Sequence, residues 1–292
     1  WELQIFGHNH PRILGVRKQF ADGQMVEIHK SYLNRFLAAA SYNLAQVLPK
    51  QLQYSFFCNS GAEAVDGALK LSYRAHRGKR SIVLRSDISF HGKTIGAGSL
   101  SSGDNFVAGK ARFSFQKIQG VKTFTYNDIE SVKNLIFQHK NDIYALFIEP
   151  FSCSTLTEAN PEFLNELRAL CSKNKIVLVF DEIYSGFGKC GPNFYMEKHG
   201  IIPDLVCISK ALGGGKASIS AYVASEEIYT RAYGTSDGAL LHSTTYNSFG
   251  EECVTAMEAC NILVEEKISE NAFKLEAVLR EELNVLGNKH AD

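Results

Sequence analysis

A lysine at the end of an apolar stretch is the residue of this sequence best placed for chemistry. Residues 205–209 (LVCIS) lead into Lys210, and three glycines follow at 213–215. Four consecutive apolar residues predict a strand that is buried on both faces. An amine held beside apolar walls loses its proton more readily and can attack a carbonyl carbon. Glycines let the backbone approach a bulky ligand, although the same pattern also fits a solvated lysine at a turn.

A second candidate site lies at the start of a predicted helix. The stretch 54–58 predicts a short strand, and Ser60, Gly61 and Ala62 follow it almost directly. Ser60 and Glu63 have the spacing of a capping box, which marks a helix N-terminus. The unpaired backbone N–H groups of such a terminus can bind an anion such as phosphate. An ordinary capped helix without a ligand has the same pattern.

Strands and helices alternate along the rest of the chain. The predicted strands are 54–58, 81–85, 144–148, 176–180 and 205–209, and the predicted helices lie near 13–20, 32–48, 61–76, 129–138 and 161–170. The stretch 219–223 predicts a further strand, at an edge or antiparallel, and residues 100–125 predict a long surface excursion. This alternation is typical of an α/β fold with a mostly parallel sheet and helices on both faces.

Such a sheet brings the charged residues at its strand ends together. Glu149, Asp181 and Lys210 each follow a predicted strand, and Phe90 and His91 follow the strand 81–85. Ligands of parallel sheets bind beyond the carboxyl ends of the strands, so we expect these residues at one edge. The amine, the anion site, the carboxylates and a stacking ring together suit pyridoxal 5′-phosphate, bound to Lys210 as a Schiff base.

The overall composition excludes several other classes of protein. The 292 residues are 45% hydrophobic and 21% charged, with 31 basic and 31 acidic side chains. A zero net charge does not favour binding to nucleic acid or an anionic membrane, and no apolar run approaches the roughly 20 residues of a membrane span. Seven scattered cysteines without a CxxC pair indicate reduced thiols in a cytoplasmic protein, and no cluster of residues predicts a metal site.

Several motifs resemble one known family, and they occur in its order. They are SGAEA at 60–64, FHG at 90–92, EP at 149–150, DEI at 181–183, GFG at 186–188, SKALGGG at 209–215 and HSTT at 242–245. Together they resemble the class III pyridoxal-phosphate aminotransferases, the group of ornithine, acetylornithine and putrescine aminotransferases. The resemblance spans nearly the whole chain and implies fold type I of the pyridoxal-phosphate enzymes.

The resemblance implies roles for the residues around the cofactor ring. Lys210 would hold the cofactor and carry a proton between it and the substrate, and Asp181 would pair with the pyridinium nitrogen. Phe90 and Ile183 would cover the two ring faces. His91 is expected among the cofactor contacts.

Further roles concern the phosphate and the substrate. Gly61 and Ala62 would donate backbone N–H groups to the phosphate, with Ser60 close by. Thr245 would reach the phosphate of a neighbouring subunit, which implies a homodimer with shared sites. Glu149 would lie near the substrate and switch partners between the two half-reactions.

The sequence departs from the family pattern in three places. Tyr184 replaces a glutamine that contacts the cofactor 3′-oxygen, and it could keep that contact or line the substrate pocket. The turn at 247–250 differs from the Gly-Gly-Asn-Pro of the family. We expect an N-terminal segment with dimer-contact helices at 1–48, a large cofactor-binding domain at 49–262 and the start of a truncated small domain at 263–292. The third departure is this small domain, most of which we expect to be missing. In the family it usually carries an arginine that binds the substrate carboxylate.

The function predicted from these residues is transamination, from an amino acid or ω-amine donor to an oxo or aldehyde acceptor. An aminomutase of the same fold, which moves an amine within one molecule, is the first alternative. A family member without catalysis is the second. An absorbing, yellow cofactor would separate the enzymes from the second alternative, and release of an oxo product would separate transaminase from mutase.

Overall fold

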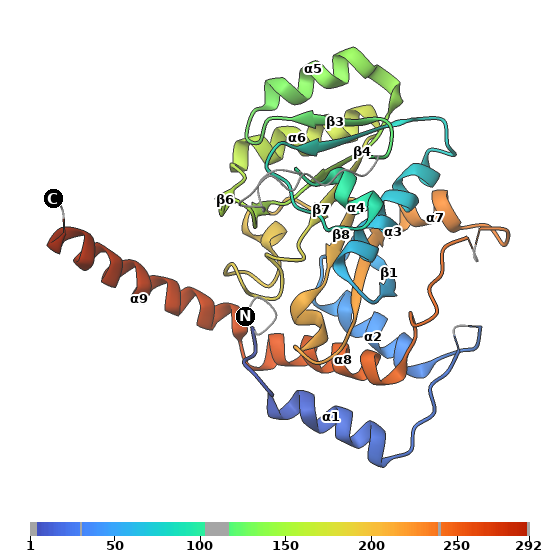
Figure 1. Cartoon of the computed structure of the whole chain (residues 1–292), viewed down its shortest axis with the longest axis vertical. Coiled ribbons are helices and arrows are strands. Elements are labelled where there is room, and N and C mark those ends of the chain that lie inside the picture. The colour runs from blue at the N-terminus through green and yellow to red at the C-terminus, as the bar shows by residue number, and fades with distance from the viewer. Residues whose placement is uncertain (1–4, 30, 103–116, 239–240, 291–292) are drawn as a thin grey trace.

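The body of the molecule is a seven-stranded sheet with helices on both faces (Figure 1). The computed structural model describes residues 5–29, 31–102, 117–238 and 241–290. The strands of the sheet are β1 (Leu52–Cys58), β2 (Ile82–Ser86), β3 (Val121–Phe124), β4 (Ile143–Ile148), β7 (Val177–Asp181), β8 (Leu205–Ile208) and β9 (Ser220–Ser225). A small hairpin consists of β5 (Phe151–Ser152) and β6 (Thr157–Glu158).

The helices connect these strands and extend beyond the sheet. They are α1 (Pro11–Asp22), α2 (Arg35–Gln46), α3 (Gly61–Ala75), α4 (Ile95–Leu100), α5 (Ile129–His139), α6 (Pro161–Asn174), α7 (Glu226–Tyr233), α8 (Gly250–Glu265) and α9 (Ile268–Lys289). Short 3₁₀ turns lie at Lys140–Asp142, Tyr195–Lys198 and Lys210–Gly213.

The strand order of the sheet is β1-β9-β8-β7-β4-β2-β3. β9 is antiparallel to both of its neighbours, β1 and β8, whereas the other pairings are parallel. β1 therefore runs in the same direction as the other parallel strands. The predicted mostly parallel sheet is confirmed, and the carboxyl ends of β1, β2, β4, β7 and β8 share one edge.

Two apolar cores lie on opposite faces of the sheet because successive side chains of a strand point to opposite sides. In β7, Leu178 and Phe180 belong to one core, and Val177 and Val179 belong to the other. Side chains of α3, α4 and α7 complete the second core, and side chains of α1, α2, α5, α6 and α8 complete the first. β7 is buried on both faces, which makes its carboxyl end a rigid support.

The start of α3 has the predicted local structure. The Ser60 hydroxyl accepts the Glu63 N–H, and the Glu63 carboxylate accepts the Ser60 N–H at 2.8 Å, which completes the capping box. At α6, Pro161 occupies the first turn as expected. Asn160 stands at the N-cap position there, but its side chain forms no capping hydrogen bond.

One sequence-based expectation about strands was confirmed and one was wrong. β9 is antiparallel, one of the two predicted alternatives, and it lies inside the sheet rather than at an edge. The predicted surface excursion at 100–125 contains β3, which pairs with β2 at the edge of the sheet. Two of the four β3 residues are exposed, so the stretch lacks the apolar pattern of a buried strand. Residues 103–116 of that excursion lie outside the described residues.

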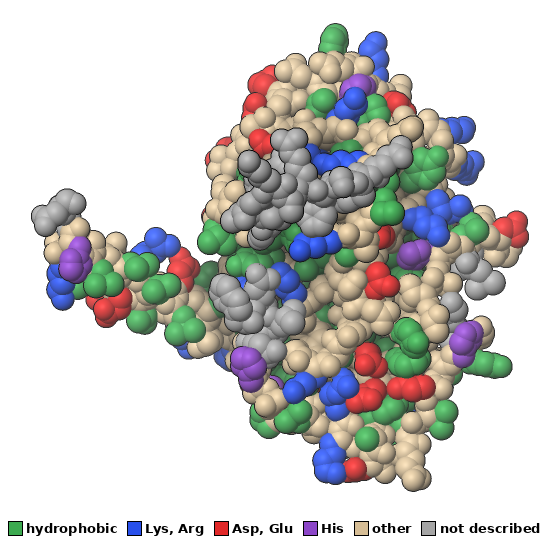
Figure 2. Space-filling model, viewed as in Figure 1, with side chains coloured by type: hydrophobic (Ala, Val, Ile, Leu, Met, Phe, Trp, Pro, Cys, Tyr) green, Lys and Arg blue, Asp and Glu red, His purple; other side chains and the backbone are tan. Residues whose placement is uncertain are grey.

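The last helix, α9, extends away from the body of the molecule (Figure 1). None of its residues is buried, and apolar side chains such as Leu275, Val278 and Leu279 are exposed along it (Figure 2). The expected domain boundaries at 48/49 and 262/263 stay predictions, and the second of them falls inside α8. Within the described part of the chain, no helix is long and apolar enough to cross a membrane.

Candidate active site

A pocket opens at the shared carboxyl edge of the parallel strands. Its volume, including the part open to solvent, is about 390 Å³. The residues that line it are Gly61, Ala62, Phe90, His91, Gly92, Glu149, Cys153, Asp181, Ile183, Tyr184 and Lys210. The structure therefore brings together all of the predicted site residues except Ser60 and Thr245. They come from chain segments up to 149 residues apart, which the parallel sheet aligns at one edge.

Lys210 enters this pocket from the end of β8. Its backbone has φ +49°, a left-handed conformation that is costly for a residue with a side chain. The lysine Nζ lies 4.8 Å from the centre of the Tyr184 ring. Next to it, the Ser209 and Ser220 hydroxyls are hydrogen-bonded at 2.6 Å, which ties the end of β8 to β9. Backbone strain of this kind is typical of functional sites, where surrounding structure holds it.

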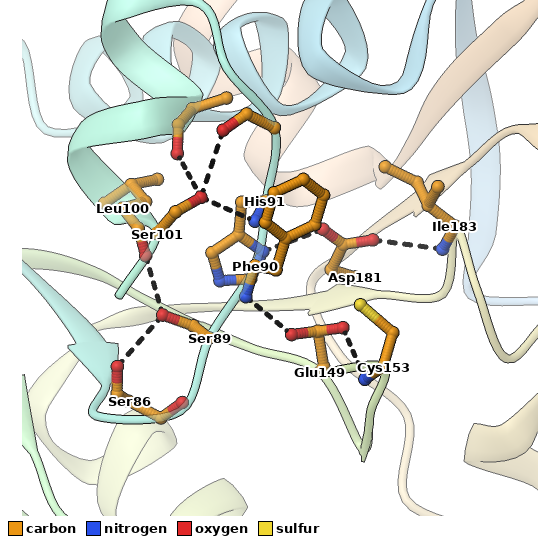
Figure 3. Close-up of polar contacts among 12 residues, drawn as sticks. Ser86, Ser89, Phe90, His91, Leu100, Ser101, Glu149, Cys153, Asp181 and Ile183 are labelled. Carbon is orange, nitrogen blue, oxygen red and sulfur yellow. Dashed lines mark hydrogen bonds and ion pairs between the residues drawn. The ribbon is translucent and has the colours of Figure 1, made fainter. Parts of the chain in front are cut away.

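Asp181 ends β7 and is almost fully buried. Its Oδ2 lies 2.7 Å from Nδ1 of His91, and its Oδ1 accepts the backbone N–H of Ile183 at 3.0 Å (Figure 3). A carboxylate can accept more than two hydrogen bonds, so Asp181 can still receive a donor from the pocket. The Nε2 atom of His91 is buried and has no protein partner in the described structure.

Phe90 and His91 lie on a loop after β2 that is anchored by serines. The Ser89 hydroxyl contacts the carbonyl oxygens of Ser86 at 2.9 Å and Leu100 at 2.7 Å. The His91 N–H donates to the Ser101 hydroxyl at 2.8 Å (Figure 3). These contacts tie the loop to the end of α4, and they hold the backbone on both sides of Phe90.

Glu149 follows β4 and is also buried. Its Oε2 accepts the Phe90 N–H at 2.8 Å, and its Oε1 accepts the Cys153 N–H at 3.0 Å. Burial raises the pKa of the Glu149 carboxyl above its usual value. His91 opposes this shift and Asp181 adds to it. The role predicted for Glu149, switching partners beside the substrate, is not tested by these contacts and stays a prediction.

The first turn of α3 forms the wall of the pocket beside the Phe90 loop. Its backbone N–H groups have no partner within the helix, as at any helix start. A Cβ atom on Gly61 would lie 2.8 Å from the Ile183 side chain, and one on Gly92 would lie 2.7 Å from Ala62. The position of Gly92, with φ +130°, therefore favours glycine and lets its segment approach the backbone of Ala62, whereas a side chain at Gly61 would have to displace the end of the Ile183 side chain. Ser60 caps the helix and is exposed outside the lining of the pocket.

Two residues that line the pocket and one residue beside it were absent from the predicted contacts. Gly92 and Cys153 both line it. Gly92 belongs to the FHG motif and Cys153 lies in the uncommon stretch just after the EP motif at 149–150, so the sequence held a signal for both. Burial, followed by the nearby Glu149, raises the pKa of the Cys153 thiol, so it is a neutral group. The residue beside the pocket is Lys189, whose Nζ lies 4.2 Å from the centre of the Tyr184 ring.

Thr245 is exposed and does not line the pocket of its own chain. Its predicted contact with a neighbouring subunit stays a prediction. Among the described residues, no group of three or more His, Cys, Asp or Glu side chains could hold a metal ion. All seven cysteines are free thiols.

The residues present fit pyridoxal 5′-phosphate. Gly61 and Ala62, the first residues of α3, line the pocket, and the unpaired N–H groups of a helix start are suited to phosphate. A carboxylate for a ring nitrogen and an amine for an aldehyde line the same pocket. The fold and site thus define the class of lysine-dependent pyridoxal-phosphate enzymes.

Comparison with known proteins agrees. Over residues 1–292 the chain matches the family described as Aminotransferase class-III, and it belongs to that family. Among solved structures, it resembles an (S)-enantioselective omega-transaminase from Thermomicrobium roseum, with 21% identity and a TM-score of 0.88 over 97% of this chain and 67% of the other. A taurine:2-oxoglutarate aminotransferase from Bifidobacterium kashiwanohense, in complex with PLP and glutamate, has 22% identity and a TM-score of 0.83 over 97% and 67%.

An ornithine aminotransferase from Toxoplasma gondii is similar at 23% identity and a TM-score of 0.84, over 97% of this chain and 64% of that protein. The chain thus spans about two thirds of the length of these structures. The predicted family, fold type and cofactor are confirmed, and at the level of the family so is the aminotransferase class. Neither the aminomutase nor the non-catalytic alternative is favoured.

Proposed function

We propose that the protein transfers an amino group from an amino acid or ω-amine donor to an oxo or aldehyde acceptor. The observation that carries this proposal is the convergence of Lys210, Asp181 and the first turn of α3 on one pocket. Each supplies a different part of the chemistry: an amine nucleophile, a buried carboxylate and backbone N–H donors. The membership of the family supports the reaction type.

Bound pyridoxal phosphate supplies an aldehyde for the amine and a ring that accepts an electron pair. Lys210 Nζ would bind that aldehyde and, once displaced by the donor amine, remove a proton from the donor's amine-bearing carbon. The same Nζ would then return the proton to the cofactor carbon. The hydrogen bond between Ser209 and Ser220 ties the end of β8 to β9, and so helps to fix the backbone from which the Lys210 side chain starts.

Asp181 would hold a proton on the ring nitrogen, which keeps the ring a good electron acceptor. His91 supports this role because its Nδ1 lies 2.7 Å from Asp181 Oδ2 and fixes the plane of the carboxylate. The Ile183 N–H fixes the other oxygen at 3.0 Å. A buried carboxylate with both oxygens oriented is suited to a single, directed contact with a cation.

Apolar side chains and the helix start would orient the cofactor. Phe90 and Ile183 lie on different segments of the pocket lining and would cover the two ring faces. The N–H groups of Gly61 and Ala62 would bind the phosphate at the positive end of the α3 dipole. Ser60 would act through the cap that it gives this helix.

A homodimer with shared sites is part of the proposal. Thr245 is exposed, and the exposed apolar residues Leu33 and Tyr246 lie in the same part of the surface. Asn34 donates a side-chain hydrogen bond to the Ser248 carbonyl, which joins these two segments. Exposed apolar clusters of this kind typically mark an interface, and Thr245 would reach the partner's phosphate from it.

The substrate would meet an aromatic wall. Tyr184 lines the pocket, and its ring is nearly parallel to that of Phe151, with 6.2 Å between the centres and an interplanar angle of 5°. Contact of Tyr184 with the cofactor 3′-oxygen stays an open alternative to a role in substrate binding.

The free thiols support a reducing, cytoplasmic location.

The test is a screen of amino donors against the purified protein loaded with pyridoxal phosphate. Alanine, ornithine, taurine and an arylalkyl amine would be added singly without an acceptor, and the absorbance of the cofactor followed. We expect at least one donor to bleach the yellow form and release its own oxo product. Bleaching without oxo product would indicate an aminomutase, and a protein that never turns yellow would contradict the proposal.

A further inference from the structure

Glu149 joins two segments of the chain that form one wall of the pocket. It directly follows β4, and only 3% of its surface is exposed. One carboxylate oxygen accepts the Phe90 N–H at 2.8 Å and the other accepts the Cys153 N–H at 3.0 Å. Figure 3 shows the carboxylate between these two backbone groups, with Phe90 on one side and Cys153 on the other.

The two segments have another link. The Ser152 hydroxyl donates to the Ile88 carbonyl oxygen at 3.2 Å, two residues before Phe90. Ser152 is fully buried in β5, so this second contact also lies inside the protein. The loop after β2 is therefore held on both sides of Phe90 by its own serines, and by Glu149 and Ser152 from the segment that follows the neighbouring strand β4.

Both carboxylate oxygens of Glu149 thus have backbone donors. If Glu149 turned to a substrate, the N–H groups of Phe90 and Cys153 would each lose a charge-assisted hydrogen bond in a largely buried place. Such a loss is costly because water cannot replace the acceptor there. This geometry favours a fixed carboxylate over one that changes partners.

We propose that Glu149 is a positioning residue that fixes the backbone of Phe90 and Cys153, and through Phe90 the ring that packs on the cofactor. The inference rests on the proposed function, since it assumes that Phe90 covers the cofactor ring. It is an alternative to the sequence-based expectation that Glu149 switches partners beside the substrate, and the experiment below decides between the two. Cys153, a neutral thiol, is held at the pocket wall by the same carboxylate.

The test uses the variant Glu149→Gln. A glutamine has one acceptor oxygen and one NH₂ donor. It can therefore accept a hydrogen bond from only one of the two backbone N–H groups, and its NH₂ group would face the other N–H, which is also a donor. The probe is 4′-deoxypyridoxine 5′-phosphate, which lacks the aldehyde and cannot bond to Lys210. We expect its dissociation constant to rise about tenfold or more in the variant, as for one lost charge-assisted hydrogen bond.

Glu158→Gln is the matched control. Glu158 lies in β6 of the adjacent hairpin, 40% of its side chain is exposed, and it pairs with Lys198 outside the pocket. We expect this variant to bind the analogue within about twofold of the wild type, as for an exposed ion pair. Unchanged analogue affinity in Glu149→Gln, with a raised KM for the amino donor alone, would overturn the proposal in favour of a substrate contact.

Amide hydrogen exchange keeps the proposal testable if the variant fails to fold. In the wild-type protein without cofactor, the amides of Phe90 and Cys153 should both exchange slowly. Rapid exchange at either amide would contradict the proposal that Glu149 fixes the backbone there. In a folded Glu149→Gln, exchange at one of them should accelerate by about tenfold or more. A wild type that fails to bind the analogue would contradict the proposed function, while the exchange rates would still decide on Glu149.

Discussion

The segments that follow β4 and β7 share one feature, a buried glutamate that accepts backbone hydrogen bonds, but the surroundings of the two glutamates differ. Each contains a buried glutamate, Glu149 after β4 and Glu182 after β7, with 3% and 1% of the residue surface exposed. Each glutamate accepts two backbone N–H groups from elsewhere in the chain, and Ser185 adds a hydroxyl donor to Glu182 at 3.2 Å.

The groups that they hold are different. Glu149 holds Phe90 and Cys153, which line the pocket. Glu182 holds the backbone of Tyr195 and Met196, whose side chains are buried behind the site. The same interaction can therefore serve ligand binding in one place and folding stability in the other, and only the position of the held groups distinguishes the two.

The largest effect is expected from Lys210→Ala, which tests whether the pocket beside Glu149 is the reactive one. Turnover should fall by at least about 10³-fold because both the nucleophile and the proton carrier are lost. The variant should fold and bind the cofactor loosely, since the side chain faces the pocket rather than a core. Steady-state kinetics and circular dichroism check this, and measurable turnover at the wild-type level would refute the role of Lys210.

Asp181→Asn has the next largest expected effect. It distinguishes the role of Asp181 from that of the neighbouring Glu182 at the end of β7. The amide keeps the shape but cannot hold a proton on the ring nitrogen as a charged partner, so proton abstraction should slow by about 10² to 10⁴-fold. Cofactor affinity should fall far less. Single-turnover absorbance with one donor measures the step, and an unchanged rate would mean that the ring nitrogen has another partner.

Glu182→Gln is expected to change stability and its pH dependence. Burial raises the pKa of Glu182 to about 7, against the opposing N–H groups of Met196 and Tyr195. Between its ordinary value of 4.5 and about 7 the folded protein binds more protons than the unfolded chain, so Glu182 makes stability fall as pH rises through that window. The loss amounts to roughly 3 kcal/mol at most.

The Glu182→Gln variant should lack this pH-dependent part of the stability. Its destabilisation relative to wild type should be larger at pH 5 than at pH 7.5, when measured by urea unfolding of the cofactor-free protein, because the wild type loses stability across that range. Analogue affinity should stay within about twofold, in contrast to Glu149→Gln. An equal destabilisation at both pH values would contradict the shifted pKa, and a weakened affinity would remove the contrast between the two glutamates.

The smallest effect is expected from Gly92→Ala, next to the loop that Glu149 holds. Gly92 has φ +130°, and an added Cβ would lie 2.7 Å from that of Ala62. Strain and the clash together should cost about 1–3 kcal/mol and loosen cofactor binding. Gly200→Ala is the matched control because Gly200 also has a positive φ, +66°, but open space around it. Equal effects of the two variants on analogue affinity would show that the close approach to Ala62 is unimportant.

The sequence predicted the parts of the site that depend on local patterns. The apolar strands ending at Glu149, Asp181 and Lys210, and the capping box at Ser60, are each visible within a few residues. The shared edge follows from the alternation of strands and helices. The position of β9 between β1 and β8 was not predictable in this way, because an antiparallel strand in the middle of a parallel sheet depends on pairing over a long distance.

The partners of the buried carboxylates were also beyond the sequence. Phe90 and Glu149 are 59 residues apart, and their contact joins a backbone N–H to a side chain, which leaves no pattern in residue types. The left-handed backbone conformation of Lys210 leaves no pattern in the sequence either, because the surrounding fold imposes it on a residue type that normally avoids it. β3 was missed because its exposed residues give a short edge strand the appearance of a loop.

The central claim is that the amine of one residue, at the end of β8, carries the cofactor. Borohydride reduction of the protein loaded with pyridoxal phosphate, followed by peptide mass mapping, tests this directly. The account predicts that the reduced cofactor is attached to residue 210 and that mutation of this residue abolishes the attachment. Stoichiometric labelling of a different lysine, such as Lys93 or Lys189, with residue 210 unmodified, would contradict it.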